Sequence, residues 1–127
     1  MTYPIIVLTL VVGKVKALRM FSNLVIANPF FRKLYTFEPH FVQTLARSFQ
    51  MLLFDFHYDI ADHLSKLKVD AQMFLVEWFY TVFSRCLSFE GTLKFWDQLL
   101  YFGEVVLFRM ALAIFELVKP HIMEANY

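Results

Sequence analysis

Apolar side chains recur at helical spacing along nearly the whole chain. One series, with steps of four, four, three and four residues, is Phe41, Leu45, Phe49, Leu52 and Phe56. Such spacing places these side chains on one face of a helix. Alternation with a period of two residues, which is typical of strands, is absent over any long stretch. The pattern therefore predicts an all-α fold.

Glycine, proline and capping residues divide this pattern into separate helices. Gly13 and Gly103 interrupt it, Pro39 suits a first helical turn, and Asp70 and Ser88 are good N-caps. A loop is expected from Asn28-Pro29 through Phe37. We expect helices over Tyr3–Val12, Lys14–Ala27, Pro39 to Leu67 with a break, Ala71–Arg85, Phe89 to the residue before Gly103, and Glu104–Lys119.

Two of these helices allow their faces to be predicted. In the helix after Ser88 the wet face is Glu90, Lys94, Asp97 and Tyr101, and the inward face is Phe89, Leu93, Trp96 and Leu100. The last helix is apolar nearly all round, apart from Arg109 and Glu116, which is typical of a helix buried in a larger protein. A buried Arg109 needs a partner. Asp97 is the first candidate and Glu77 the second; the alternative is that Arg109 is itself a catalytic arginine finger.

Composition adds an apolar surplus to this picture. The 127 residues suit one domain or part of one, yet 59% are apolar or Tyr, 19% are aromatic and only 18% are charged. Soluble domains are about 45–50% apolar and about 25% charged. Uncharged runs stop before the roughly 20 residues of a membrane span, so we expect no transmembrane span. The surplus then indicates burial against a partner chain or against a missing part of the same domain.

Charge is unevenly distributed although the net charge is only +1. Residues 1–50 carry six basic groups and one acid, a net +5, while residues 51–127 carry six basic and ten acidic groups, a net −4. Such asymmetry either marks a surface for an oppositely charged partner or reflects which side chains cover each face. No basic stripe accompanies the aromatic residues, so we expect no nucleic-acid partner.

Three segments, in order, resemble the C-terminal half of a TBC domain, the helical domain of Rab GTPase-activating proteins. The segment from Glu77 to Arg85 is similar to the family's E-W-F-x-x-x-F-S-R helix, and Phe95-Trp96-Asp97 is similar to its I-W-D segment. Residues 103–114 are similar to G-E-x-x-L-F-R-x-A-L-A-I. The family-motif structural residues are Trp78, Phe79, Trp96, Asp97, Phe108 and Arg109. Lys16 to Val25 would stand for an A-F-W-x-L-V-x-L helix, although Arg19 and Met20 depart from its aromatic pattern.

The resemblance also implies a mechanism whose residues this chain lacks. In the family, an arginine in I-x-x-D-x-x-R and a glutamine in Y-x-Q-G-M act in trans on GTP bound to a Rab. Ile60-Ala61-Asp62 does not fit the first motif, and Phe41-Val42-Gln43 lacks the Gly-Met of the second. We therefore expect no catalytic residue in this chain and no stimulation of GTP hydrolysis by it. Met1 resembles the Met that ends Y-x-Q-G-M, which indicates a truncated, wrongly started or naturally split domain.

The resemblance implies a partial TBC-like domain over residues 1–119 and a C-terminal tail over 120–127. Its partner would be a Rab-type small GTPase, with GTP and magnesium on that partner, and its location cytoplasmic or peripheral on endomembranes. The alternative is a non-catalytic helical interaction module that self-associates or binds another chain. A small membrane-embedded protein is the third hypothesis.

Other constellations have simpler interpretations. Asp59, Asp62 and His63, with His57 nearby, have the spacing of metal ligands, but they also fit a solvated helix face, and we expect no metal site. Trp78 and Trp96 could stack a ligand, but packing in the core is the expected role. The single cysteine, Cys86, excludes an internal disulfide and has no visible base beside it. No cofactor motif is present, so none is expected.

Overall fold

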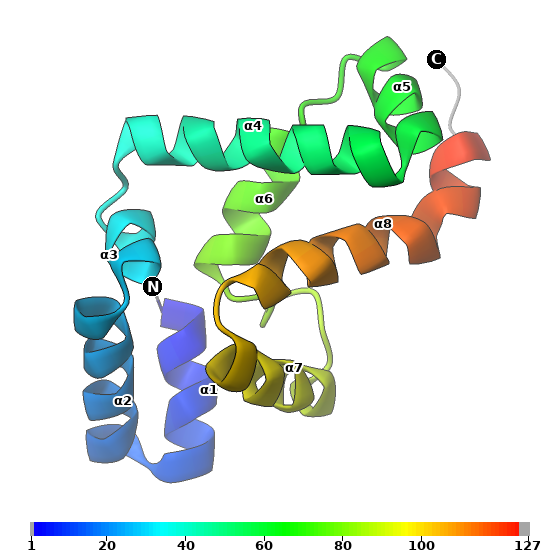
Figure 1. The fold of residues 1–127 in the computed structure, drawn as a ribbon. Coiled ribbons are helices and arrows are strands. Elements are labelled where there is room, and N and C mark those ends of the chain that lie inside the picture. The colour runs from blue at the N-terminus through cyan, green and yellow to red at the C-terminus, as the bar shows by residue number, and fades with distance from the viewer. Residues whose placement is uncertain (1, 125–127) are drawn as a thin grey trace.

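The computed structural model describes residues 2–124, which form helices without any strand (Figure 1). The helices are α1 (Thr2–Val12), α2 (Lys14–Ala27), α3 (Pro29–Tyr35), α4 (Pro39–Phe56), α5 (Tyr58–Lys66), α6 (Ala71–Tyr80), α7 (Phe89–Phe102) and α8 (Val105–Glu124). The prediction of an all-α fold is confirmed.

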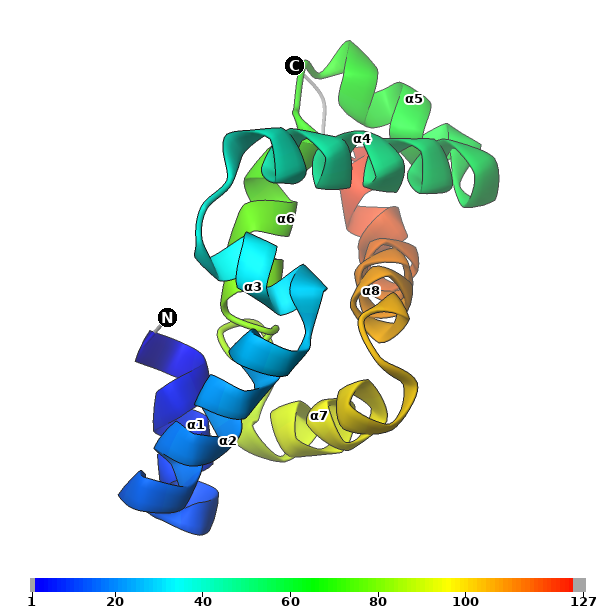
Figure 2. The same ribbon diagram turned by 60° about the vertical axis from the view of Figure 1, so that its left-hand side comes forward.

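The helices surround a central aromatic core. Helices α1 and α2 form an antiparallel hairpin that joins the remaining helices through α3 (Figure 1). Helix α4 packs against α5 and α6, and α8 packs against α5, α6 and α7. Figure 2 shows α4 along one edge of the molecule, with α6 and α8 descending from it and α7 closing the opposite end. The helices that carry the three motif segments, α6, α7 and α8, therefore lie together.

Helix α3 replaces the loop that was expected between Asn28 and Phe37. The Asn28 side chain caps it, because Oδ1 accepts hydrogen bonds from the amides of Phe30 (2.8 Å) and Phe31 (3.4 Å). Pro29 occupies the first helical position, where a missing N–H costs nothing. Three side chains of this short helix are buried: Phe31, Leu34 and Tyr35. The expectation of a loop is wrong because the Asn-Pro pair starts a helix here.

The predicted caps of α6 and α7 are confirmed, but the predicted inward face of α7 is not. Asp70 accepts from the amide of Gln72 (2.8 Å), and Ser88 accepts from the amide of Gly91 (3.1 Å). The buried residues of α7 are Thr92, Phe95, Trp96 and Leu99. Of the expected inward face, Phe89 is 51% and Leu100 is 61% exposed. The buried positions recur at i, i+3, i+4 and i+7 from Thr92, so Trp96 is the buried member of the expected set and Leu93 is half-buried.

Helix α8 continues past the expected end at Lys119. It runs to Glu124 with Pro120 inside it. A proline removes one backbone donor, which is a local loss. Two contacts hold this part of α8 against α5: Lys119 pairs with Asp59, and Glu116 lies 3.1 Å from His57. Residues 120–124 of the expected tail are thus helical, and residues 125–127 lie outside the described residues.

The apolar surplus is largely on the surface. Large apolar side chains that are at least 69% exposed are Leu10, Val15, Ile26, Met51, Met73, Tyr101 and Leu117. On α8 the buried residues are Val106, Leu107, Ala111 and Phe115, so the described residues enclose only one side of this helix. That the helix is buried in a larger protein stays a prediction. Among residues 2–124, no helix is both long enough and apolar enough to cross a bilayer.

Gly103 controls the change of direction between α7 and α8. Its backbone has φ 78° and ψ −167°, a region that is essentially restricted to glycine. A Cβ at this position would meet nothing within 4 Å, so substitution tests the backbone alone. Gly103→Ala should lower the free energy of unfolding by about 1–3 kcal/mol. Urea denaturation measures this loss.

The matched control is Gln98→Ala, an exposed position of the same helix, which should leave the urea midpoint unchanged. Equal midpoints for Gly103→Ala and the unaltered protein would show that α7 and α8 do not depend on this backbone conformation.

Candidate functional site

The motif residues separate into an enclosed aromatic group and two exposed charges. Phe79 and Trp96 are buried, and Trp78 and Phe108 pack against the same core. Asp97 and Arg109 are exposed on α7 and α8. The candidate site is therefore the aromatic junction of α6, α7 and α8, together with the turn that follows α6.

That turn has an unusual backbone. Helix α6 was expected to reach Arg85, but it ends at Tyr80, with Thr81 as its C-cap. Val82 and Phe83 then adopt positive φ angles of 49° and 59°. The Val82 amide donates to the Phe79 carbonyl (3.2 Å), and the Phe83 amide donates to the Trp78 carbonyl (2.8 Å). These are the two hydrogen bonds of a Schellman motif, in which glycine usually occupies the position of Val82.

A buried hydrogen bond from α7 holds this turn in place. The Trp96 indole Nε1–H donates to the Val82 carbonyl at 2.9 Å. Val82 is 3% exposed and Phe83 is fully buried, so water does not reach this carbonyl readily. A buried carbonyl without a partner is costly. Trp96 thus supplies a hydrogen-bond donor to the buried carbonyl of the strained turn that ends α6.

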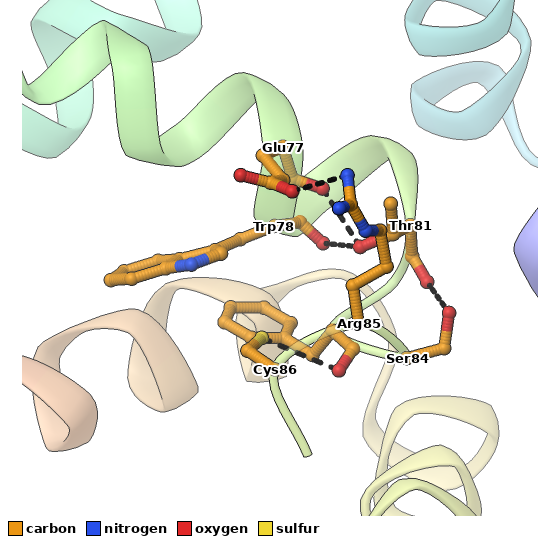
Figure 3. A network of polar contacts seen from close by, with 7 residues as sticks. Glu77, Trp78, Thr81, Ser84, Arg85 and Cys86 are labelled. Atoms are coloured by element: carbon orange, nitrogen blue, oxygen red, sulfur yellow. Dashed lines mark hydrogen bonds and ion pairs between the residues drawn. The ribbon is translucent and has the colours of Figure 1, made fainter.

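Polar contacts within the same segment join the end of α6 to the residues that follow the turn (Figure 3). The Glu77 carboxylate pairs with the Arg85 guanidinium, which also lies 5.2 Å from the centre of the Tyr3 ring. The Thr81 hydroxyl donates to the Glu77 carbonyl at 2.8 Å. The Ser84 hydroxyl donates to the Thr81 carbonyl at 2.5 Å. Glu77 and Arg85 therefore bracket the turn, and Arg85 connects it to α1.

Aromatic contacts join the three helices. The Phe79 and Phe108 rings meet edge to face at 5.2 Å, and the Phe83 and Phe95 rings do so at the same separation. Trp78 packs on Phe74, Phe83 and Phe115. Trp78 therefore packs on core aromatics, and Trp96 is buried in the same core, so both indoles have the core role that was expected. Edge-to-face pairs of this kind contribute about 0.5–1.5 kcal/mol each beyond the area they bury.

Arg109 does not have the buried partner that was expected. Both Arg109 and Asp97 are exposed, and within residues 2–124 no ion pair joins them. Glu77, the second candidate, pairs with Arg85. Arg109 lines a shallow surface groove between α7 and α8, together with Lys94 and Gln98. The prediction is wrong because an exposed guanidinium is solvated by water and needs no carboxylate.

The candidate metal ligands on α5 are engaged by other side chains. Asp59 pairs with Lys119, Asp62 with Lys66 at 2.6 Å, and His57 with Glu116. The hydrogen bond from Lys119 lowers the pKa of the Asp59 carboxyl. The contact between Asp59 and Lys119 therefore stabilises the fold at neutral pH, and this stabilisation is lost as the pH falls through the lowered pKa of Asp59. In the described part of the chain, no group of three such side chains could hold a metal ion.

Neither the lone thiol nor the apolar cavity beside the turn offers a reaction site. Partial burial raises the pKa of the Cys86 thiol, which donates to the Phe83 carbonyl at 3.3 Å. A raised pKa leaves little of the nucleophilic thiolate. The cavity, bordered by Leu8, Phe21 and Trp96, holds about 60 Å³, well below the roughly 300–1,000 Å³ of typical ligand pockets.

Replacing Trp96 tests the link between the motifs. Trp96→Phe keeps an aromatic ring but leaves the buried Val82 carbonyl without its donor, which should lower the free energy of unfolding by about 1–3 kcal/mol. Trp78→Phe is the matched control, because the Trp78 indole N–H has no hydrogen bond within the described residues. Equal losses in chemical denaturation would show that the indole hydrogen bond contributes nothing specific.

Comparison with known proteins agrees with this arrangement. The sequence model of the Rab-GTPase-TBC domain matches residues 1–123. Drainin of Dictyostelium discoideum is 26% identical over 78% of this chain and 22% of its own length. Carabin of Mus musculus is 36% identical over 64% of this chain and 19% of its own length. TBC1 domain family member 2A of Mus musculus is 39% identical over 49% of this chain and 7% of its own length.

The chain thus spans less than a quarter of each of these relatives. No solved structure matches it significantly. The family match covers nearly the whole chain, and the three motif segments meet at one junction in the fold. The chain belongs to the Rab-GTPase-TBC domain family.

Proposed function

We propose that this chain is the scaffold portion of a Rab-GAP TBC domain and serves a regulator of small GTPases in membrane traffic. Family membership supports a Rab-type GTPase as partner, with GTP and magnesium bound to that partner. The described geometry supports a scaffold role for Trp78, Phe79, Trp96 and Phe108, because these residues pack the junction of α6, α7 and α8. The proposed location is the cytoplasm, with peripheral attachment to endomembranes.

The observation that carries this proposal is the absence of both finger motifs from the 127 residues. Neither I-x-x-D-x-x-R nor Y-x-Q-G-M occurs in the sequence. An arginine finger contributes about 10³–10⁵ in rate by stabilising charge on the transferred phosphoryl group. Arg85 is paired with Glu77, and Arg109 and Gln98, which line the same groove, belong to neither finger motif. The chain by itself is therefore inactive as a GTPase activator.

A phosphate-release assay tests this proposal. Rab GTPases loaded with GTP should hydrolyse it at the same rate with and without the purified chain, because both finger side chains are missing. An active TBC protein added to the same Rab serves as the positive control. A clear acceleration by this chain would overturn the proposal, and loss of that acceleration in Arg109→Ala would identify Arg109 as the finger.

Exposed apolar surface favours a second candidate, a non-catalytic interaction module. Large exposed apolar patches mark interfaces in soluble proteins. On α4 and α5, Met51, Phe54, Phe56 and Tyr58 are each at least 53% exposed. Such a surface would be covered by a second copy or by another chain. Analytical ultracentrifugation of the purified chain measures its oligomeric state. A stable dimer or larger oligomer in the absence of any Rab favours the interaction module.

A further inference from the structure

The free end of the α1–α2 hairpin combines exposed apolar side chains with unpaired cations. We define the hairpin tip as Leu10, Lys14, Val15, Lys16, Leu18 and Arg19. Leu10 is 70%, Val15 74% and Leu18 59% exposed. Figures 1 and 2 both show the turn of this hairpin as the part of α1 and α2 farthest from α3 and α4. The hairpin tip is therefore available to a large, flat partner.

The charge around the hairpin tip has a single sign. Residues 2–37 contain five cations, Lys14, Lys16, Arg19, Arg32 and Lys33, and no acidic residue. The three cations of the hairpin tip are exposed, and none of them forms an ion pair in the described part of the chain. This segment supplies most of the positive charge of the first half of the sequence, and a field of one sign attracts groups of the opposite sign.

Exposed apolar side chains beside lysine and arginine match the two layers of a membrane interface. The apolar groups enter the boundary between headgroups and acyl chains, and the cations meet the phosphate and carboxylate groups of anionic lipids. Because no helix in residues 2–124 can span a bilayer, the contact has to be superficial. We propose that the hairpin tip docks this chain on a bilayer that contains anionic lipids.

A second copy of the chain fits the hairpin tip less well. In a two-fold dimer the same surface meets itself, so three cations would face three cations. Repulsion between like charges opposes that contact. An anionic bilayer has the opposite charge, and its interface also covers Leu10, Val15 and Leu18. The proposal names the element and the lipid charge for the peripheral attachment proposed above, and it holds whether or not a Rab is bound.

Vesicle sedimentation tests the proposal with the full chain. The chain should pellet with phosphatidylcholine vesicles that contain phosphatidylserine and remain in the supernatant with phosphatidylcholine alone. Added salt should weaken the binding by screening the cations. Equal pelleting with both kinds of vesicle, or with neither, overturns the proposal. This assay contains no nucleotide, so its failure is distinguishable from failure of the GTPase proposal.

Paired variants locate the contact. Each cation near an anionic surface contributes about 1 kcal/mol, or about fivefold in affinity, so Lys14→Glu/Lys16→Glu should bind at least tenfold more weakly. Arg47→Glu/Lys68→Glu changes the net charge equally at exposed positions on α4 and after α5, and should bind as the unaltered chain does. Leu10→Gln/Val15→Gln should also reduce binding, because cations alone do not insert.

Circular dichroism checks that the exposed substitutions leave the helices intact. Equal weakening by the two charge-reversed variants would indicate nonspecific attraction and overturn the proposal. A hairpin-tip variant that changes the oligomeric state but binds vesicles normally would assign this surface to a protein partner instead.

Discussion

The reversal of the chain after α6 is the constraint on which the rest of the structure depends. Val82 and Phe83 adopt left-handed backbone angles that cost roughly 1–2 kcal/mol per residue for amino acids with a Cβ. The Trp96 indole hydrogen bond and the full burial of Phe83 offset that cost. Because the chain turns here, α7 and α8 return to α6 and the three aromatic groups meet. The motif segments therefore contain both a strained turn, at Val82 and Phe83, and the Trp96 side chain that donates a hydrogen bond to it.

Contacts between helices are concentrated at that junction, whereas exposed apolar side chains lie toward the edges of the fold. Edge-to-face rings join α6, α7 and α8, and the contacts Asp59–Lys119 and His57–Glu116 hold α5 to the end of α8. The link between α7 and α8 contacts the start of α3 through the Asn28 amide and the Glu104 carboxylate (3.3 Å). In contrast, the α1–α2 hairpin leaves much of its apolar surface to solvent. A framework with a rigid centre and uncovered edges agrees with the proposed scaffold role.

Local sequence signals predicted most helices because their causes are local. Gly13, Asp70, Ser88 and Gly103 start or end helices through their own backbone freedom or side-chain oxygens. Asn28-Pro29 carries the same kind of signal for α3, but an Asn-Pro pair is equally common in loops. The end of α6 had no such signal, because a valine occupies the position where glycine is usual and a tryptophan fourteen residues later supplies the support. The surroundings of Arg109 were likewise unpredictable, since apolar neighbours along α8 do not show which face the other helices leave open.

Hydrogen exchange at the two indole N–H groups, followed by nuclear magnetic resonance, tests the central claim most directly. The Trp96 indole proton is bound to the buried Val82 carbonyl, while the half-buried Trp78 indole has no acceptor in the described part of the chain. The account predicts that the Trp96 indole proton exchanges far more slowly than that of Trp78, and that the Phe83 amide is protected with it. Rapid exchange at both Trp96 and Phe83 would contradict it, because the turn would then be open in solution.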